Sequence, residues 1–496
     1  MIKNFSVIIP AIYLTAALLI PLLRSRHERY AHSIALSAVF AAALVSINNI
    51  YYVINNGTIH HHFGGWTPPI GIEYVLDPLS AFVVFVINSV VFFILIHAVK
   101  VNAIELHSKE IPYYSVVMLM MLGFNGMIMT GDFFNLFVFL EISSLSVYGL
   151  MAMGDRGSAF ASFRYLLLGT IGASFFLLGL GFLYMVSGSL NMSDLKEIIP
   201  LLSNSPVLII ALTLMVTGVG IKMAVFPLHG WLPDAYTLAS SSTSALIAAI
   251  GTKVSAYVMI RILFFVFGVE YVTEIFPVTL VLGWLGAAGI IYGSILAIAQ
   301  KEMKSMLAYS SVAQIGYITL GISMANPLGF IGAVLHIINH AFMKGALFLV
   351  AANLRVRAGH SDISRLHKVC AKKMPVTMAC FTVAAISMIG LPPVAGFFSK
   401  WYLVLGAVDN RQWIFMGVIL LSSLLNAVYF FRIIENVYIK SSDSDEEMKS
   451  CTLAEDEPGF SMIGPLVLFA MTLLLLGLFN VYIVNNIILL MMPPGL

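Results

Sequence analysis

Long apolar segments recur along the whole chain and restrict what it can fold into. About 20 apolar residues are enough to cross the hydrocarbon core of a bilayer as an α-helix, and fourteen such segments are present. They cover residues 4–23, 31–53, 75–99, 112–130, 133–153, 160–187, 206–228, 239–267, 276–299, 303–323, 327–353, 374–404, 412–437 and 460–490. The pattern predicts an all-α polytopic membrane protein with about 14 transmembrane helices.

Composition supports lipid as the solvent. The chain is 60% hydrophobic and only 10% charged, whereas about a quarter of the residues of a soluble domain are charged. Its net charge of +2 excludes the strongly basic surface of a nucleic-acid-binding protein. The first apolar segment is followed by Arg24, Arg26 and Arg29 and lacks a cleavage site of small residues, so we expect a retained span rather than a signal peptide.

Lysine and arginine are distributed unevenly between the links. If the N-terminus is outside, the outer links hold only Lys3, Lys196 and Arg411. The inner links then hold Arg24, Arg26, Arg29, Lys100, Lys109, Arg156, Lys301, Lys304, Arg355, Arg357, Arg365, Lys368, Lys372, Lys373, Lys440 and Lys449. Because cytoplasmic links carry the excess of these residues, both termini are predicted to lie outside.

Neither a metal site nor a cofactor site is predicted. Cys370, Cys380 and Cys451 form no CxxC or Cys/His spacing that would hold zinc or an iron–sulfur cluster, and no cofactor motif is present. Three consecutive histidines, His60 to His62, stand in an outer link. A solvated loop is favoured there over a metal site.

Short matches between the two halves of the chain indicate an internal repeat. Ser143-Ser144 matches Ser310-Ser311, and Pro227 with Gly230 matches Pro393 with Gly396 at nearly the same offset. Gly172-Ala173 also matches Gly345-Ala346. Each repeat would contain five spans. Because five is odd, the second repeat would be inverted in the membrane, as in many transporters.

Two of the segments contain helix breakers at corresponding places. The prolines are Pro227, Pro233, Pro392 and Pro393. Proline removes a backbone donor and clashes with the preceding turn, and the freed backbone groups must face protein or water. A packing kink is the alternative, but a lysine near each break, Lys222 and Lys400, favours a hydrated site.

Charged residues inside the spans indicate ion transport. Glu141 is the only acid placed so deeply, about eight residues from either end of its segment. Lys222, Lys253, Lys344 and Lys400 are its basic counterparts. Buried charges of this kind are costly and either pair or line water. A structural ion pair is the alternative for Glu141, and snorkelling is the alternative for Lys344.

Three further residues follow a helical spacing. His336, His340 and Lys344 are four residues apart and therefore share one helix face. No nearby Glu or Cys completes a zinc site. Histidine titrates near neutral pH, which favours a proton relay, and a hydrogen-bonded core histidine is the alternative.

Several stretches resemble the antiporter-like subunits shared by respiratory complex I and the Mrp cation/proton antiporters. They are Gly65-Trp66 with Pro69, Gly71-Ile72 and Asp77-Pro-Leu-Ser, Asn135-Leu-Phe-Val-Phe-Leu-Glu141, Lys222 with Phe226-Pro-Leu-His-Gly-Trp-Leu-Pro-Asp-Ala235, Thr252-Lys253-Val with Tyr257 and Arg261, Ala308-Tyr-Ser-Ser with Gln314-Ile-Gly-Tyr, His336 with Asn339-His340 and Lys344, and Gly390-Leu-Pro-Pro with Gly396-Phe-Phe-Ser-Lys400. The resemblance covers nearly the whole chain.

The resemblance implies a fold and roles for the charged residues. It implies three N-terminal helices in 1–111, inverted five-helix repeats in 112–268 and 269–440, and an acidic loop with a last helix in 441–496. It further implies a proton path in the membrane midplane. In that path Glu141 pairs with Lys222, Lys253 is central, and Lys400 ends the second broken helix; His336, His340 and Lys344 connect Lys253 to Lys400.

The sequences around Lys222 and Lys253 are most similar to those of the Mrp D subunit. We therefore expect a proton-translocating subunit of a multisubunit Na⁺/H⁺ antiporter in a bacterial or archaeal cell membrane. Its expected partners are the other antiporter subunits and the bilayer, with protons and Na⁺ crossing the complex and no nucleic acid bound. The alternatives are a proton-pumping subunit of a complex I-like oxidoreductase or membrane-bound hydrogenase, and a structural scaffold with vestigial charges.

Overall fold

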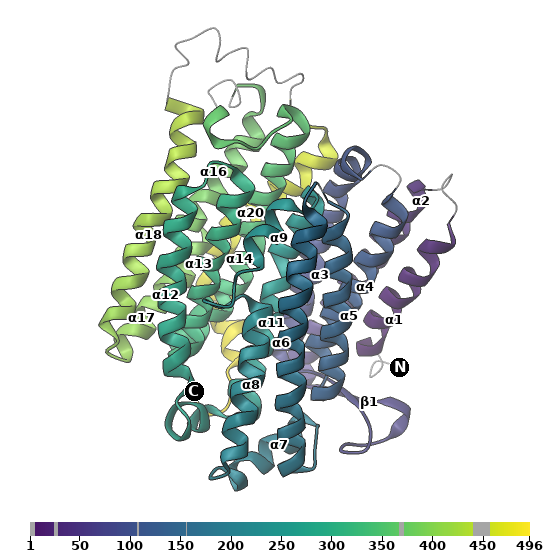
Figure 1. Cartoon of the computed structure of the whole chain (residues 1–496), viewed down its shortest axis with the longest axis vertical. Coiled ribbons are helices and arrows are strands. Elements are labelled where there is room, and N and C mark those ends of the chain that lie inside the picture. Colours follow the sequence, from purple (N-terminus) through teal and green to yellow (C-terminus); the bar gives the residue numbers. More distant parts are fainter. Residues whose placement is uncertain (1–4, 24–27, 107–108, 155, 367–371, 440–456) are drawn as a thin grey trace.

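The protein is a bundle of helices with a small β-hairpin at one end (Figure 1). The computed structural model describes residues 5–23, 28–106, 109–154, 156–366, 372–439 and 457–496. The predicted acidic link and two of the three cysteines, Cys370 and Cys451, lie outside the described residues.

The first half of the chain contains the hairpin and most of the long outer helices. Its elements are α1 (Phe5–Leu19), α2 (Glu28–Asn56), β1 (Ile59–His62), β2 (Glu73–Leu76), α3 (Pro78–Glu105), α4 (Glu110–Met129), α5 (Phe133–Ala152), α6 (Ser158–Ser187), α7 (Met192–Ile198), α8 (Pro206–Met223), α9 (Leu232–Leu238), α10 (Ser241–Leu246) and α11 (Thr252–Ile260). A π-helical turn, Ile247–Gly251, joins α10 to α11, and another, Arg261–Phe267, continues α11.

The described residues of the second half form helices joined by short links and contain no named β-strand. Its elements are α12 (Val278–Ala299), α13 (Met303–Ser323), α14 (Pro327–Ala358), α16 (Pro375–Ile389), α17 (Ala395–Asp409), α18 (Trp413–Ile434), α20 (Phe460–Leu478) and α21 (Asn480–Ile483). Shorter 3₁₀ or π turns are Ile20–Leu22, Phe63–Gly65, Ile199–Leu202, Tyr271–Ile275, Ile363–Arg365, Glu435–Ile439, Val484–Ile488 and Leu489–Met491.

Every predicted apolar segment is helical, although not all of the helices are long. Eleven helices among the described residues are long and apolar enough to cross a membrane. The other three predicted segments correspond to the short helix α1, to α13 and to the α16–α17 pair. This is a multi-pass membrane protein with an all-α core. That all fourteen segments cross the bilayer stays a prediction.

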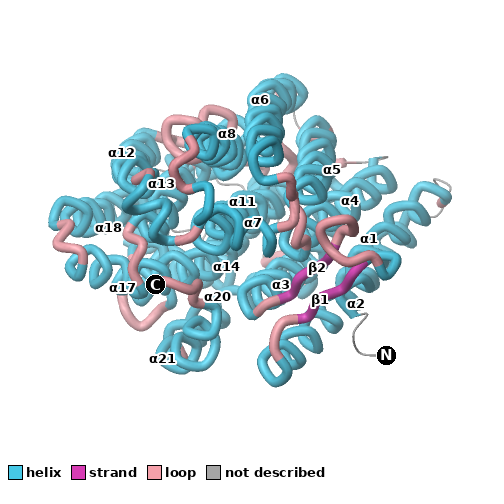
Figure 2. Tube along the Cα trace, turned by 90° about the horizontal axis from the view of Figure 1, so that it is seen from below, coloured by secondary structure: helices cyan, strands magenta, loops and turns pink. Residues whose placement is uncertain are grey.

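The hairpin corrects two expectations from the sequence. β1 pairs antiparallel with β2, with Ile59 opposite Leu76, and Figure 2 shows the hairpin lying across the lower ends of α1, α2 and α3. His60 to His62 therefore belong to a strand rather than to a solvated loop. Residues 75 and 76 belong to β2 and not to the following span, because Asp77 caps α3 and Pro78 begins it.

The long helix α14, which carries His336, His340 and Lys344, lies at the centre of the bundle. In α14 every residue from Gly329 to Leu354 is buried. α3, α10, α13, α16, α17 and α20 pack around it. Asn326 caps its N-terminus by accepting a hydrogen bond from the Gly329 amide. Its histidines and lysine therefore face protein instead of lipid, as expected for ionisable groups within a membrane.

Both helix interruptions occur around the prolines noted in the sequence. The chain leaves helical structure between Met223 and Leu232, which includes Pro227, and Pro233 lies in the first turn of α9. It does so again between Ile389 and Ala395, which includes Pro392 and Pro393.

Candidate functional site

The first interruption places a buried lysine against α5. Lys222 lies in the last turn of α8 and is 5% exposed. Its Nζ donates hydrogen bonds to Ser144 Oγ at 2.7 Å and to Tyr148 Oη at 3.1 Å. Trp231, beyond the interruption, donates its indole N–H to the Ile221 carbonyl at 2.8 Å. The same carbonyl accepts a hydrogen bond from the Ala224 amide at 3.1 Å, so Trp231 adds a second bond where α8 ends.

Glu141 lies one helical turn before Ser144 on α5 but does not contact Lys222 directly. Within the described part of the chain the two side chains make no ion pair within 4 Å, and Oε1 of Glu141 is buried without a hydrogen-bond partner. The carboxylate is nevertheless close enough for its charge to act on the Lys222 ammonium. The structure therefore places these two residues near one another with Ser144 and Tyr148 holding the lysine.

A small cavity connects the surroundings of Lys222 to the helix that carries Lys253. Its volume is about 20 Å³, and its lining includes Lys222, Ser144, Thr252 and Ser255. A space of this size has room for about one water molecule, which could bond to the hydroxyls and the ammonium group in its otherwise mostly apolar lining. Thr252 immediately precedes Lys253, so the cavity leads from the first interruption toward the centre of the bundle.

Lys253 is completely enclosed and depends on an irregular turn for its hydrogen bond. It is 1% exposed, and its Nζ donates to the Ala248 carbonyl, which lies in the π-helical turn before α11. Such turns are frequent at functional sites because they release backbone groups from the helical pattern. The Lys253 ammonium is also close enough to His336, His340 and Lys344 to act on their charge.

The polar face of α14 lies beside Lys253. His336 Nδ1 is 2.9 Å from Ser399 Oγ, and its Nε2 is 2.8 Å from Gln314 Oε1. The His340 ring is 6.0 Å from that of His336, and neither of its buried nitrogens has a hydrogen-bond partner among the described residues. Buried polar atoms without protein partners are normally satisfied by water.

Lys344 extends the same face toward α13. Its Nζ donates to the Leu307 carbonyl at 2.7 Å and to Ser310 Oγ. The side chain is fully buried and does not reach the membrane surface. Snorkelling therefore does not account for this residue.

The second interruption places Lys400 at the other end of the polar face. Its Nζ donates to the Met388 and Ile389 carbonyls, at 2.9 and 3.0 Å, and to Ser423 Oγ at 3.3 Å. Both carbonyls are exposed by the end of α16, where the negative end of the helix dipole favours a cation. Lys400 also lies 4.7 Å from the centre of the Tyr317 ring.

Comparison with known proteins identifies the family. Residues 130–426 match the family described as NADH:quinone oxidoreductase/Mrp antiporter, TM. The chain is also 44% identical over 488 residues to NADH-quinone oxidoreductase subunit N of Desulforudis audaxviator, covering 97% of this chain and 96% of the relative. The chain belongs to this family.

Two other comparisons agree with that membership. The D subunit of a Na⁺/H⁺ antiporter of Alkalihalophilus pseudofirmus is 30% identical over 83% of this chain and 82% of its own length. A chain from the membrane-bound sulfane sulfur reductase, an archaeal respiratory membrane complex, has a TM-score of 0.88 and 29% identity over 97% of this chain and 96% of that one. All the candidate residues lie within the part matched by the family.

The structure changes the spatial order of the candidate residues in this family member. Chain order would place Lys344 next to Lys400. In the structure His336 is the residue beside the second interruption, because Ser399, the neighbour of Lys400, contacts its ring. Lys344 lies two helical turns away against α13. The α14 face therefore has Lys344 at one end and His336, near Lys400, at the other.

Sequence reasoning missed the neutral residues that hold the charged ones. Ser144, Tyr148 and Ser399 each contact a candidate lysine or histidine. Gln314 and Tyr317 lie next to His336. A usable signal was present, because polar residues recur on the buried faces of α5 and α13 at positions three and four residues apart.

Two of the histidines of β1 contact a buried acid. His60 and His62 have Nδ1 atoms 3.1 and 3.6 Å from Glu73 Oε2, and Asn191 donates to Glu73 Oε1 at 2.8 Å. Among the described residues no group of three or more His, Cys, Asp or Glu is placed to hold a metal ion.

Proposed function

We propose that this protein is a proton-translocating subunit of an energy-converting membrane complex of the NADH:quinone oxidoreductase type. The observation that carries the proposal is the set of enclosed, protonatable side chains across the middle of the bundle. Lys222, Lys253, His340 and Lys344 lie on three neighbouring helices, and Lys400 follows beyond His336. Their contacts to hydroxyls and carbonyls, with a water-sized cavity that extends from Lys222 to Thr252, the neighbour of Lys253, support stepwise proton transfer.

The candidate residues carry more positive than negative charge, and this excess favours proton transfer over a fixed set of ion pairs. Glu141 is the only candidate acid beside these lysines. Enclosing an unpaired ammonium group costs several kcal/mol. A lysine in such a place is therefore easily neutralised, and it can both receive a proton and pass it on.

Glu141 supplies the control step in this mechanism. At a separation of about 4 Å, a carboxylate and an ammonium attract one another by roughly 4 kcal/mol at an effective dielectric constant of 20. Approach of Glu141 holds the proton on Lys222, and withdrawal lets Lys222 give it up. The proton then passes through the cavity to Lys253, along the α14 histidines, and to Lys400. The direction of net transfer depends on the complex that drives it.

Two inverted repeats are part of the same proposal. Residues 112–268 would form the first and residues 269–440 the second, flanked by 1–111 and 441–496. The internal matches of Ser143-Ser144 with Ser310-Ser311 and of Pro227 with Pro393 support this division. Both termini would lie outside, at the end of the molecule that carries the hairpin in Figure 1.

Sequence similarity favours the redox complex over the Mrp antiporter. Identity to the oxidoreductase relative is 44% over nearly the whole of both chains, against 30% for the antiporter relative over about four-fifths of them. The sequence alone favoured the Mrp D subunit, and the comparisons support the alternative better. Redox centres would belong to other subunits, which are the proposed partners together with the bilayer.

Purification of the native complex tests the proposal. A tag on this chain should recover iron–sulfur or quinone-reducing subunits, and the complex in proteoliposomes should acidify or alkalinise the lumen only while its electron donor is oxidised. Recovery of small antiporter subunits, with proton movement driven by a Na⁺ gradient and indifferent to electron donors, would overturn the assignment to a redox complex. A complex that moves no protons under either condition would overturn proton translocation itself.

A further inference from the structure

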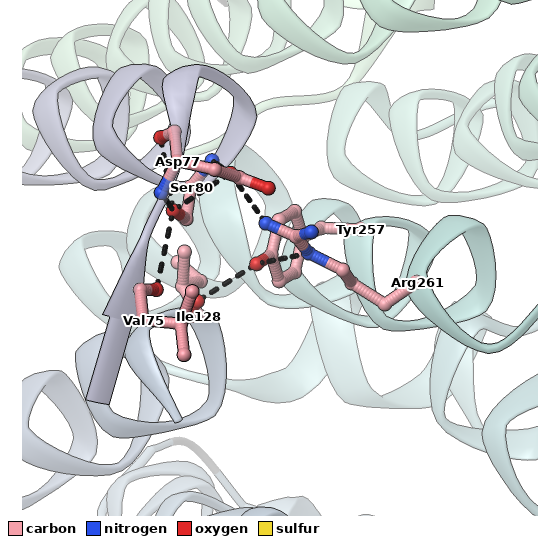
Figure 3. Close-up of polar contacts among 6 residues, drawn as sticks. All are labelled: Val75, Asp77, Ser80, Ile128, Tyr257 and Arg261. Atoms are coloured by element: carbon pink, nitrogen blue, oxygen red, sulfur yellow. Dashed lines mark hydrogen bonds and ion pairs between the residues drawn. The ribbon is translucent and has the colours of Figure 1, made fainter. Parts of the chain in front are cut away.

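A second polar cluster lies between Lys253 and the hairpin end of the bundle (Figure 3). Tyr257 and Arg261 follow Lys253 at intervals of four residues, so all three share one face of the helix. Arg261 Nε donates to Tyr257 Oη at 2.7 Å, and Tyr257 donates to the Ile128 carbonyl at 2.7 Å. The cluster begins one helical turn beyond Lys253.

An ion pair closes the cluster on the side toward the hairpin. Nη2 of Arg261 contacts Oδ1 of Asp77, and the two side chains are only 11% and 16% exposed. Asp77 is also the N-cap of α3, where it accepts a hydrogen bond from the Ser80 amide at 2.9 Å. The pair therefore ties the helix that carries Lys253 to the start of α3.

A large cavity lies directly beside this ion pair. Its volume is about 260 Å³, room for several water molecules, and its lining includes His60, Ser193 and Lys196 on the outer side and Asp77, Tyr257 and Arg261 at its inner end. Lys196 and Ser193 are exposed, whereas Tyr257 is 2% exposed. The cavity thus runs from the protein surface to a point one turn from Lys253.

We propose that this cavity is a route by which Lys253 exchanges protons with the hairpin side of the membrane, and that the Asp77–Arg261 pair with Tyr257 is its gate. The proposal rests on proton transfer at Lys253, the function proposed above. When the pair is closed, the guanidinium stands in the route and repels hydronium. When Arg261 swings with Asp77 into the cavity, water reaches the Lys253 turn.

Cysteine accessibility tests the gate without relying on transport. In the whole complex, with Cys370, Cys380 and Cys451 changed to serine, Lys253→Cys is exposed to a membrane-impermeant anionic methanethiosulfonate from the hairpin side. Modification is then quantified by mass spectrometry. Ser193→Cys, which lines the outer part of the cavity, reports which side of the vesicle is being labelled.

Opening the gate should make the buried cysteine reactive. With Asp77→Asn and Arg261→Gln, we expect Lys253→Cys to be labelled at least tenfold faster than with the native pair. Arg365→Gln, which breaks an exposed ion pair with Asp362 elsewhere, should leave the rate unchanged. Arg261→Lys keeps the positive charge but loses the planar set of guanidinium donors, so Lys253→Cys should be labelled at an intermediate rate. This variant replaces the double variant if the latter does not assemble.

Two results would overturn the gate. One is a Lys253→Cys that stays unreactive in every Arg261 variant while Ser193→Cys reacts. The other is equal labelling with the native and the broken pair. Labelling measures whether the reagent reaches residue 253 and does not depend on transport. A complex in which breaking the ion pair speeds labelling but no protons move would overturn the proposed function, and the proposed gate would still hold.

Discussion

Gly396 fixes how closely α16 and α17 approach at the second interruption, and replacing it with alanine should disconnect His336 from Lys400. A Cβ atom at Gly396 would lie 1.8 Å from the Ser387 carbonyl oxygen. That oxygen belongs to the α16 backbone and cannot rotate away, so the contact must open to about 3.0 Å, the shortest that real Cβ atoms make. α17 must therefore move by more than 1 Å relative to α16.

The displacement is large compared with the contacts that depend on it. Ser399 and Lys400 follow Gly396 by three and four residues, and their bonds to His336 and to the Ile389 carbonyl measure 2.9 and 3.0 Å. Lengthening by more than 1 Å breaks both by ordinary criteria. Overpacking of this kind costs about 1–3 kcal/mol, which a helix bundle of this size survives, whereas a 1 Å misplacement in a reaction path can cost about a hundredfold in rate.

The assay is dye-monitored proton movement in proteoliposomes containing the assembled complex. Gly396→Ala should lower the rate at least tenfold without loss of assembly on native gels. Gly417→Ala on α18 is the matched control, because a Cβ there meets nothing within 4 Å. Proton movement at the wild-type rate in assembled Gly396→Ala would refute the coupling of the second interruption to the α14 histidines.

Three further substitutions test the site around the lysines. Glu141→Gln should slow proton movement at least tenfold in the same assay, because the Lys222 proton loses its control group; a normal rate would remove Glu141 from the mechanism. Tyr148→Phe leaves Ser144 as the only hydroxyl partner of Lys222. It should slow proton movement about tenfold, since a hydrogen bond to a charged group contributes about 1.5–3 kcal/mol. An effect on assembly alone would indicate a packing role for Tyr148. Lys400→Gln leaves the end of α16 short of donors and should lower the melting temperature of the complex as well as the rate, whereas an unchanged melting temperature would show that Lys400 does not stabilise the break.

Much of the architecture could be predicted from the sequence because lipid leaves so few options. Backbone groups within a bilayer must bond internally, so each long apolar segment had to be helical, and each is. The prolines predicted where two helices end. The hairpin was missed because Ile59–His62 is short and rich in histidine, and because the apolar residues of β2 run directly into those of α3.

The site was predictable in its residue types but not in its connections. Periodicity placed His336, His340 and Lys344 on one face, yet nothing in it revealed that His336, and not Lys344, lies beside Lys400. The position of Lys400 beside His336 depends on how the chain turns after Pro393, before α17 begins at Ala395. The Asp77–Arg261 pair joins residues 184 positions apart, and no local pattern reports such a contact.

Proton movement by a Lys253→Met complex is the decisive test of proton transfer along this path, since Lys253 lies between the first interruption and the α14 histidines. Proteoliposomes containing the purified wild-type and variant complexes are supplied with the electron donor, and proton movement and electron transfer are recorded together. We expect Lys253→Met to assemble normally and to move at least tenfold fewer protons through this subunit. Electron transfer should slow in proportion where the two processes are tightly coupled. An assembled Lys253→Met complex with the wild-type rate and the wild-type number of protons per electron would contradict proton transfer along this path.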